Sequence, residues 1–432
     1  MEKNKVAKNA GWLVGMQLIK SIIGVVISML TARYLGPSNF GVINYASSIV
    51  AFLAPIMQLG LNGILVQEIV SNPEKEGEIL GTAITLSFFS SLFCILGVVS
   101  FVAIINFGET ETILVCTLYS LLLTFQALEM IVYWFQAKLL SKYSSTISLI
   151  AYIIISVYKI FLLIAHKSIY WFAISNALDY MLIAIGLFYL YRKLGGMKLS
   201  FCFSTAESLF SKSKYYIVSN MMITIFAQTD RIMLKLMIGD EATGYYSAAV
   251  TCAGMTGFVF SAIIDSFRPL VFEQQKNSHS RYKEILVTLY SIVTYLSLAQ
   301  SIAVTIFASV IIKILYGSAY MQSISILQVL TWYCTFSYLG GARDIWILAE
   351  QKQKHLLTIN AIGALMNVGL NAILIPQFQA IGAAIASLLT QFFINYVFIL
   401  IYKPTRINGI MQIKALNVKY LFSLFKYFRR KT

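Results

Sequence analysis

The amino-acid sequence predicts an all-α integral membrane protein with twelve transmembrane helices, arranged as two parallel-repeat six-helix bundles around a central cavity. Three observations support this fold class. The 432 residues are 58% hydrophobic and only 12% charged, with a mean hydropathy of +0.76, whereas soluble domains carry about 25% charged residues. Long apolar blocks recur along the chain, and two glycine-containing connectors resemble each other in sequence.

The apolar blocks are long enough to cross a bilayer as helices. The block ILGTAITLSFFSSLFCILGVVSFVAII carries no charge, and about 20 apolar residues in a helix span the hydrocarbon core. Membrane-spanning strands would alternate polar and apolar residues, so helices are expected here. The first block is too long for a cleavable signal peptide and is expected to remain in the mature protein. The expected spans are 9–34, 40–67, 79–106, 112–137, 143–165, 168–191, 214–238, 244–268, 284–314, 322–349, 355–375 and 378–402.

The basic residues orient these spans. An even number of spans places both termini on one side of the membrane, and Lys and Arg favour the cytoplasmic side. With a cytoplasmic N-terminus, the outer connectors carry only Arg33, Lys167 and Lys313 among the basic residues. Both termini are therefore expected in the cytoplasm. The net charge of +15 then follows from topology and calls for no nucleic-acid partner.

The C-terminal tail differs from the rest of the chain. Lys419, Lys426 and Arg430 recur at helical spacing opposite Phe422 and Phe425. This pattern predicts an amphipathic helix that lies on the anionic inner leaflet, and a disordered basic tail is the alternative. The expected domains are an N-terminal bundle, a cytoplasmic linker, a C-terminal bundle and this tail, at 1–195, 196–213, 214–402 and 403–432.

A connector near the start of the chain returns near its middle. The stretch TARYLGPSNFGVINYAS resembles LKLMIGDEATGYYSAAV, which pairs Gly36 with Gly239, and further on Trp134 pairs with Trp346. Each half then holds six spans that begin on the same side, a plan used by transporters. Each connector would close the first helical hairpin of its bundle on the outer face, where glycine permits a tight turn with positive φ or close helix packing.

Ionisable residues inside apolar spans are costly and mark candidate functional sites. Several lie on polar helical faces, which predicts a water-filled cavity lined by cations, amides and hydroxyls. This lining fits a hydrated anionic cargo, because Lys and Arg hold phosphates by charge-assisted hydrogen bonds. The alternative is that the charges pair with one another, with Asp344 or Asp179 neutralising the cations. The expected lining residues are Lys20, Lys159, Arg231, Arg343, Gln17, Gln126, Gln228 and Tyr152.

Acidic residues, cysteines and histidines set further limits on function. Glu129, Asp179 and Asp230 are candidates for carrying a coupling ion, because the sequence has no nucleotide-binding motif that would supply energy. The five cysteines are scattered without paired spacing, and the three histidines lie in connectors. No disulfide, metal site, cofactor or catalytic residue is therefore expected.

Three stretches resemble a known family. ARYLGPSNFGVINYA, TDRIMLKLMIGDEATGYYSAA and LMNVGLNAILIPQFQAIGAAIAS are similar to segments of the Wzx-type polysaccharide-biosynthesis flippases, or O-antigen transporters, of the multidrug/oligosaccharidyl-lipid/polysaccharide exporter superfamily. The resemblance implies that the chain exports an undecaprenyl-pyrophosphate-linked oligosaccharide across a bacterial inner membrane by alternating access, for O-antigen, capsule or another surface polysaccharide. It also implies that Lys20, Arg231 and Arg343 meet the pyrophosphate or acidic sugars, and that other polysaccharide-assembly membrane proteins are partners.

Three other functions stay open at this point. A multidrug or toxin extruder of the same superfamily would need a more apolar pocket and an ion-coupling carboxylate in the first bundle, whereas the first span offers Lys20. A membrane enzyme such as a polymerase or ligase would present a long outer loop, and every expected outer connector is short. A structural or scaffolding membrane protein is the third alternative.

Overall fold

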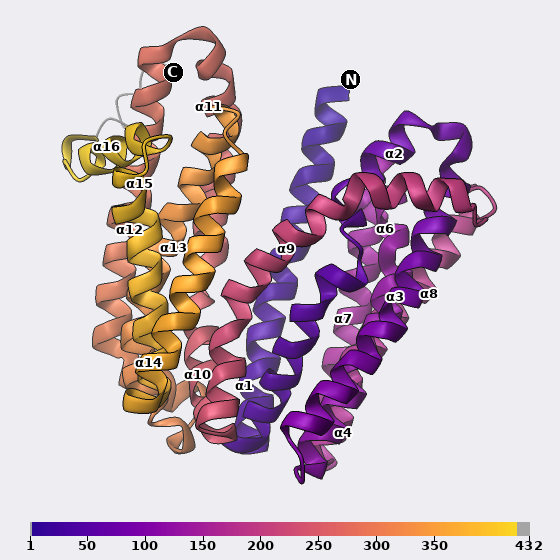
Figure 1. Cartoon of the computed structure of the whole chain (residues 1–432), viewed down its shortest axis with the longest axis horizontal. Coiled ribbons are helices and arrows are strands. Elements are labelled where there is room, and N and C mark those ends of the chain that lie inside the picture. Colours follow the sequence, from indigo (N-terminus) through magenta and orange to yellow (C-terminus); the bar gives the residue numbers. More distant parts are fainter. Residues whose placement is uncertain (1, 421–432) are drawn as a thin grey trace. The chain divides into compact units, whose positions relative to one another are not determined.

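The computed structural model describes the backbone of residues 2–420 and the side chains of residues 15–420, and this part of the chain forms helices and no strand (Figure 1). The all-α prediction is therefore confirmed. The predicted basic face of the tail beyond Tyr420 lies outside the described residues.

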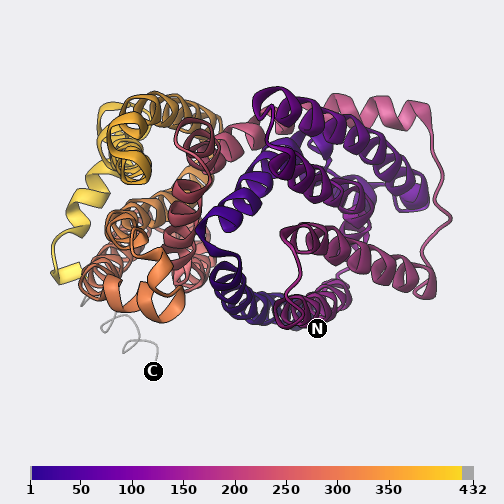
Figure 2. The same ribbon diagram turned by 90° about the horizontal axis from the view of Figure 1, so that it is seen from below.

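The chain divides into two compact units, Met1–Gln228 and Thr229–Thr432, and the boundary lies within α9. Seen along their axes, the helices of each unit run beside one another (Figure 2). The helices up to this boundary are α1 (Glu2–Met57), η1 (Leu61–Gly63), α2 (Leu65–Ser71), η2 (Pro73–Lys75), α3 (Glu76–Ile105), α4 (Thr110–Ser120), α5 (Leu122–Leu128), η3 (Glu129–Ile131), α6 (Val132–Ala137), α7 (Ser141–Ile164), α8 (Ile169–Lys193) and α9 (Phe203–Met237).

The C-terminal unit begins in α9 and contains the remaining helices. Its element η5 is a π-helix, a wider turn that often marks functional sites. These helices are α10 (Asp240–Gly254), α11 (Gly257–Asn277), α12 (His279–Leu315), η4 (Ser318–Tyr320), α13 (Ser323–Ala349), α14 (Lys354–Phe392), η5 (Phe393–Val397), α15 (Phe398–Ile401) and α16 (Arg406–Ala415).

One end of the N-terminal unit carries most of the basic residues of its connections, together with Glu74, Glu76 and Glu78. There the ammonium of Lys138, after α6, forms a 2.7 Å ion pair with Glu76 at the start of α3. At the opposite end, the Tyr34 hydroxyl donates a 3.0 Å hydrogen bond to the backbone oxygen of Lys167, between α7 and α8. The connections at the first end carry Lys75, Lys138, Lys142, Arg192, Lys193 and Lys198.

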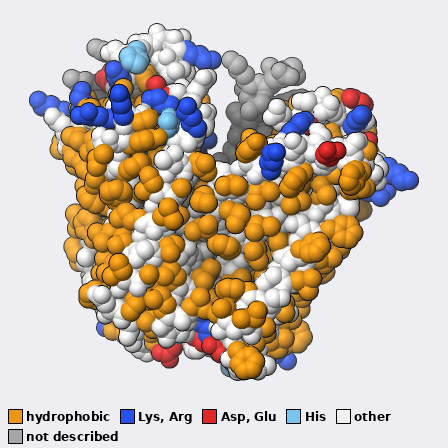
Figure 3. Space-filling view, in the orientation of Figure 1, with side chains coloured by type: hydrophobic (Ala, Val, Ile, Leu, Met, Phe, Trp, Pro, Cys, Tyr) orange, Lys and Arg blue, Asp and Glu red, His pale blue; other side chains and the backbone are white. Residues whose placement is uncertain are grey.

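In the C-terminal unit, too, basic residues gather on the connections at one end. Lys352, between α13 and α14, donates a 2.9 Å hydrogen bond to the backbone oxygen of Pro404, between α15 and α16. Tyr282 at the start of α12 donates to Glu350 at 2.9 Å, so all three connections lie at one end. Figure 3 shows Lys and Arg side chains gathered beyond a band of hydrophobic side chains. The connections at this end carry Lys276, Arg281, Lys283, Lys352, Lys354, Lys403 and Arg406.

Seven helical stretches within the described residues are long and apolar enough to cross a membrane, or eight if the pair α10 and α11, bent by 42°, counts as one span. The chain is therefore a multi-pass membrane protein. Helices α9 and α13, which contain the predicted spans 214–238 and 322–349, do not qualify, because polar residues lower their hydropathy. The count of twelve spans stays a prediction.

Two of the seven stretches contain a break that separates two helices. In α1 the break is at Gly36, with φ 71° and ψ 173°, and in α14 it is at Gln379, with φ 53° and ψ −133°. Gly36 lies in a predicted connector and Gln379 lies next to one. Gly239, which the sequence pairs with Gly36, also has positive φ, at 129°. A side chain at either glycine would meet no atom within 4 Å, so a tight turn, and not close packing, requires glycine at both positions.

Candidate functional site

Lys20 on α1 reaches across to helix α7 of the same unit. Its ammonium donates a 2.7 Å hydrogen bond to the hydroxyl of Ser148 and lies 5.2 Å from the ring centroid of Tyr152, within cation–π distance. Ser148 and Tyr152 are four residues apart, so they share one face of α7. Gly24 lies one turn after Lys20, where a Cβ would stand 2.7 Å from the Tyr152 hydroxyl. The small residue therefore lets the tyrosine approach α1.

A second lysine extends this face of α7 toward α8. Lys159 donates a 3.1 Å hydrogen bond to the side-chain oxygen of Asn176. Asp179, three residues further along α8, interacts electrostatically with both Lys20 and Lys159. Its Oδ1 atom is buried and, within the described residues, makes no hydrogen bond. One carboxylate thus interacts with two ammonium groups.

Glu129 completes the charged cluster, since it interacts electrostatically with Lys20 and Asp179. The structure therefore brings together five of the residues that the sequence singled out: two cations, two carboxylates and the ring of Tyr152. The side chains of all five are half-buried. Each carboxylate interacts with at least one ammonium group. Such a cluster can exchange an internal carboxylate for an external phosphate without leaving either lysine unpaired.

The two predicted glutamines of this unit flank the cluster. Gln17 lies three residues before Lys20 on α1 and is exposed, and Gln126 lies three residues before Glu129 and is half-buried. No side-chain hydrogen bond ties Gln126 to the cluster among the described residues. The amides therefore lie beside the charged cluster and are available for hydrogen bonding.

Asp230, on the C-terminal part of α9, is the centre of a separate polar cluster. It is 6% exposed, and its carboxylate accepts hydrogen bonds from Tyr246, from Asn371 at 2.6 Å and from Ser387 at 2.5 Å. Asn367 donates to the same carboxylate at 3.2 Å. Donors from α10 and α14 therefore stabilise a buried negative charge. The Oδ1 atom of Asn371 has no hydrogen-bond partner in the described part of the chain.

Arg231 and Gln228 lie within two residues of Asp230 on α9. The Arg231 guanidinium donates a 3.2 Å hydrogen bond from Nε to the hydroxyl of Ser247 on α10. Both Arg231 and Gln228 are half-buried and three residues apart, so they share a face of α9. Arg231 and its partner Ser247 belong to the C-terminal unit, whereas the Lys20 cluster belongs to the N-terminal unit.

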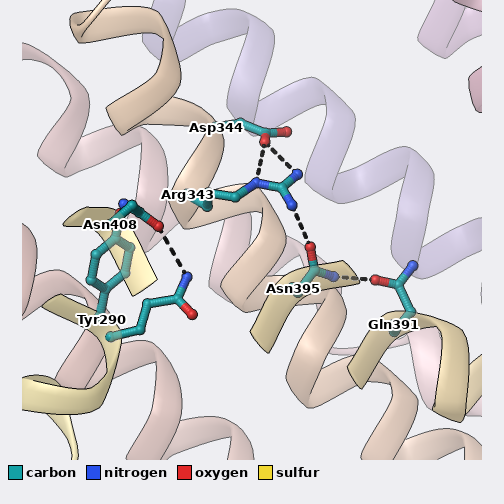
Figure 4. Close-up of polar contacts among 7 residues, drawn as sticks. Tyr290, Arg343, Asp344, Gln391, Asn395 and Asn408 are labelled. Atoms are coloured by element: carbon teal, nitrogen blue, oxygen red, sulfur yellow. Dashed lines mark hydrogen bonds and ion pairs between the residues drawn. The ribbon is translucent and has the colours of Figure 1, made fainter. Parts of the chain in front are cut away.

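Arg343 on α13 is held in a third arrangement (Figure 4). Its Nε and Nη2 atoms donate to Asp344 at 3.1 and 2.8 Å, and Nη1 donates to Asn395 at 2.7 Å. Asn395 lies in the π-helix η5 and also donates to Gln391. Arg343 is 4% exposed, and this buried cation is paired with the carboxylate of the next residue in the chain. Gly340 makes room, since a Cβ there would lie 2.7 Å from the Asn395 side-chain oxygen.

Several partners of these residues were missed at the sequence level. Asn176, Asn367, Asn371 and Asn395 are all asparagines inside helices, where they are uncharged and do not interrupt an apolar block. The spacing of Asn367 and Asn371, four residues apart, was the available signal, because two buried amides on one helical face need partners. Nothing in the local sequence of Asn395 marks the π-helix that directs it toward Arg343.

Comparison with known proteins identifies several relatives. The chain is 27% identical over 274 residues to an "Uncharacterized membrane protein MJ1068" of Methanocaldococcus jannaschii, covering 59% of this chain and about half, 52%, of that protein. It is 21% identical to the "Capsular polysaccharide biosynthesis protein CapF" of Staphylococcus aureus over 90% of this chain and 96% of that protein. It is 24% identical to the "Probable low-salt glycan biosynthesis flippase Agl15" of Haloferax volcanii, over 85% of this chain and 76% of that protein.

Solved structures and a family match agree with these relatives. A "Lipid II flippase MurJ, inward closed conformation" has a TM-score of 0.77 at 15% identity, over 96% of this chain and 92% of that chain. An inward-facing multidrug resistance transporter of the MATE family has a TM-score of 0.66 at 12% identity, over 91% and 96%. At these identities the likeness shows the fold alone. Residues 6–275 match the family described as "Polysaccharide biosynthesis protein", so the predicted family is confirmed and the chain belongs to the polysaccharide biosynthesis proteins.

Proposed function

We propose that this chain is a flippase that moves an undecaprenyl-pyrophosphate-linked oligosaccharide from the cytoplasmic to the outer leaflet of a bacterial inner membrane. The observation that carries the proposal is the cluster of Lys20, Lys159 and Asp179 inside membrane helices. A pyrophosphate needs cations, and sugars need hydroxyl and amide partners, which Ser148 and Asn176 provide. The chain acts as a transporter and not as an enzyme, with twelve spans, both termini in the cytoplasm, and the domain limits expected from the sequence.

The cluster suggests how an anionic headgroup is bound and released. Without substrate, Asp179 balances Lys20 and Lys159. A pyrophosphate that enters would take over this role, because its oxygens offer more acceptors than one carboxylate. When the bundles alternate, the return of Asp179 to both lysines would favour release. Arg231 and Arg343 would add cations along the route, and Gln17, Gln126, Gln228 and Tyr152 would contact sugar rings.

Substitution of Lys20 tests this assignment. Lys20→Ala removes the ammonium that bonds Ser148, and a lost charge-assisted hydrogen bond lowers substrate affinity about tenfold to hundredfold. Translocation of the lipid-linked glycan should fall accordingly, and Lys20→Arg should retain part of it. Lys198→Ala is the matched control, because that lysine is exposed outside the membrane helices. Equal activity of Lys20→Ala and wild type, at equal protein level, would refute the assignment.

The multidrug or toxin extruder is the competing function, since that fold is also similar. An extruder would confer resistance to cationic drugs, whereas in the Lys20 cluster two carboxylates are balanced by two ammonium groups and offer no excess negative charge to bind such a cargo. Cells that express the chain should therefore show unchanged drug sensitivity. Drug resistance that disappears with Lys20→Ala would favour the extruder over the flippase.

For the driving force we propose that Asp230 carries the coupling ion. Its carboxylate and the unpaired oxygen of Asn371 are hard oxygen ligands of the kind that small cations prefer. Glu129 and Asp179 are weaker candidates, because both already face lysines. Asp230→Asn should abolish any acceleration of transport by an imposed cation gradient, while uncoupled exchange persists. Acceleration that survives in Asp230→Asn would contradict this role.

A further inference from the structure

The C-terminal unit contains an open pocket of 260 Å³ between α12, α13, the end of α14 with η5, and α16. Four of its ten lining residues are aromatic. Phe336 and Phe392 pack with ring centroids 5.1 Å apart, and Tyr396 stacks on Phe392 at 5.9 Å. Trp332 lies on the same wall as Phe336. An apolar pocket of this kind, within a membrane protein, fits a hydrocarbon chain.

One buried oxygen atom at the pocket has no hydrogen-bond partner among the described residues. Gln412 on α16 is 3% exposed and lines the pocket. Its Nε2 atom donates a long, 3.4 Å hydrogen bond to Asn408, which in turn donates to Tyr290. Its Oε1 atom makes no hydrogen bond to any described residue. A buried acceptor without a donor is costly. A ligand that donates a hydrogen bond to Gln412 Oε1 would therefore be stabilised in the pocket.

Helix α16 presents its apolar side away from the protein. Ile407, Ile410, Ile413 and Leu416 recur every three residues and are 56%, 44%, 45% and 46% exposed, whereas Gln412 on the same helix faces inward. This is the reverse of a soluble amphipathic helix and is typical of a helix in contact with lipid. Leu416 belongs both to this row and to the pocket wall. The pocket is therefore continuous with a lipid-facing surface.

The chain on and beside α16 is rich in basic residues. The sequence contains no Asp or Glu after Glu350. Lys403, Arg406, Lys414 and Lys419 lie on or beside α16, at the end of the unit where Figure 3 shows Lys and Arg gathered. Basic residues at a membrane surface attract anionic lipid headgroups. The ligand of the pocket should therefore carry a negative charge near α16.

We propose that this pocket binds an anionic phospholipid of the phosphatidylglycerol class, with one acyl chain among the aromatic rings and a headgroup hydroxyl donating to Gln412 Oε1. The basic residues beside α16 face the phosphodiester. A polyprenyl phosphate or pyrophosphate fits less well, because its headgroup offers oxygen acceptors and Gln412 needs a donor. The site is a lipid site separate from the Lys20 cluster, and it does not depend on the function proposed above.

Native mass spectrometry of the full-length protein in detergent tests the proposal. The probes are three lipids with the same acyl chains: phosphatidylglycerol, phosphatidylmethanol, which has the same charge but no hydroxyl, and phosphatidylcholine. Phosphatidylglycerol should bind tightest. Gln412→Leu should weaken its binding about threefold to tenfold, the worth of one neutral hydrogen bond, and leave phosphatidylmethanol binding unchanged.

A second pair of variants tests the pocket itself. Leu416→Trp fills the pocket mouth and should weaken all three lipids, whereas Ile413→Trp places the same ring on the exposed row outside the pocket and should not. This pair carries the test even if Gln412→Leu fails to fold. Equal affinity of wild type for phosphatidylglycerol and phosphatidylmethanol would overturn the proposal. So would displacement of phosphatidylglycerol by equimolar undecaprenyl phosphate, or equal effects of Leu416→Trp and Ile413→Trp.

Discussion

Gly36 and Gly239 adopt backbone conformations that side chains avoid. Their φ angles are 71° and 129°, with ψ of 173° and −171°, a region that is essentially restricted to glycine. A Cβ at either position would contact no neighbouring atom within 4 Å. The requirement for glycine is therefore conformational, and its energetic cost on substitution comes from the backbone alone.

A matched pair of alanine substitutions separates this effect from helix propensity. Gly239→Ala should lower the free energy of unfolding by about 1–3 kcal/mol because Ala is strained at this φ and ψ. Gly369→Ala, inside α14 where a Cβ also meets nothing, should raise it by about 0.5–1 kcal/mol. Thermal unfolding of purified protein in detergent measures both. The same sign for the two variants would contradict the conformational argument.

The polar residues show what sequence reasoning could and could not predict. Lys20, Lys159 and Asp179 stood out because charges are conspicuous in apolar spans, and the structure brings them together. Asn371 and Asn395 did not stand out, since they are uncharged and lie within otherwise apolar stretches. Their partners lie far away in the sequence, on helices whose packing no local pattern defines.

At the scale of elements, the linker between α8 and α9 is fastened to the start of α3. The backbone N–H of Ser200 donates to the Gly77 carbonyl at 3.3 Å, and the backbone N–H of Cys202 donates to the Thr82 hydroxyl at 3.1 Å. At Gly81 a Cβ would stand 2.5 Å from the Ser200 backbone oxygen. Of the predicted linker, 196–213, only residues 196–202 are non-helical, and they follow the surface of α3 closely.

Gly81→Val should release this linker, because its Cβ would collide with backbone atoms that cannot yield without moving the chain. The reactivity of the Cys202 thiol measures this release. Cys202 is the only one of the five cysteines that is not buried, and hydrogen bonds from Ser204 and then Thr205 lower the pKa of its thiol, which favours the reactive thiolate. Maleimide labelling of Cys202 at neutral pH should rise several-fold in Gly81→Val.

Gly97→Val is the control for this experiment. Gly97 lies further along α3, and a Cβ there meets no atom within 4 Å, so the same substitution on the same helix should leave Cys202 labelling at the wild-type rate. Faster labelling in both variants would show that valine disturbs α3 in general. An unchanged rate in Gly81→Val would mean that the linker is not held by this close approach.

At the scale of the whole molecule, the turns repeat as well as the sequence. Leu139 and Gln351 both have positive φ, at 57° and 54°, and each lies five residues after one of the paired tryptophans, Trp134 or Trp346. In both turns a backbone N–H bonds the carbonyl five residues earlier. The same turn also ends α7, where His166 has a φ of 49° and the Lys167 N–H bonds the Leu162 carbonyl. The match between the two turns is therefore compatible with repeated modules and is also a common way to end a helix.

Hydropathy separates the uniformly apolar helices from the mixed ones. Helices α9 and α13 have no stretch apolar enough to count as a candidate span, and they carry Asp230 and Arg343, whose side chains are hydrogen-bonded to other helices. A hydropathy average cannot tell whether such polar side chains find partners inside the protein, so the spans 214–238 and 322–349 stay predictions.

The central claim is that this chain moves a lipid-linked glycan across a membrane through cationic contacts. Proteoliposomes that carry undecaprenyl-pyrophosphate-linked oligosaccharide in both leaflets, treated with an impermeant glycosidase, test it most directly. With wild-type protein the whole glycan pool should become cleavable, whereas protein-free vesicles protect the inner leaflet, and Lys20→Ala and Arg231→Ala should each slow the loss of that protection. An inner pool that stays protected with wild-type protein, or wild-type rates in both variants, would contradict the account.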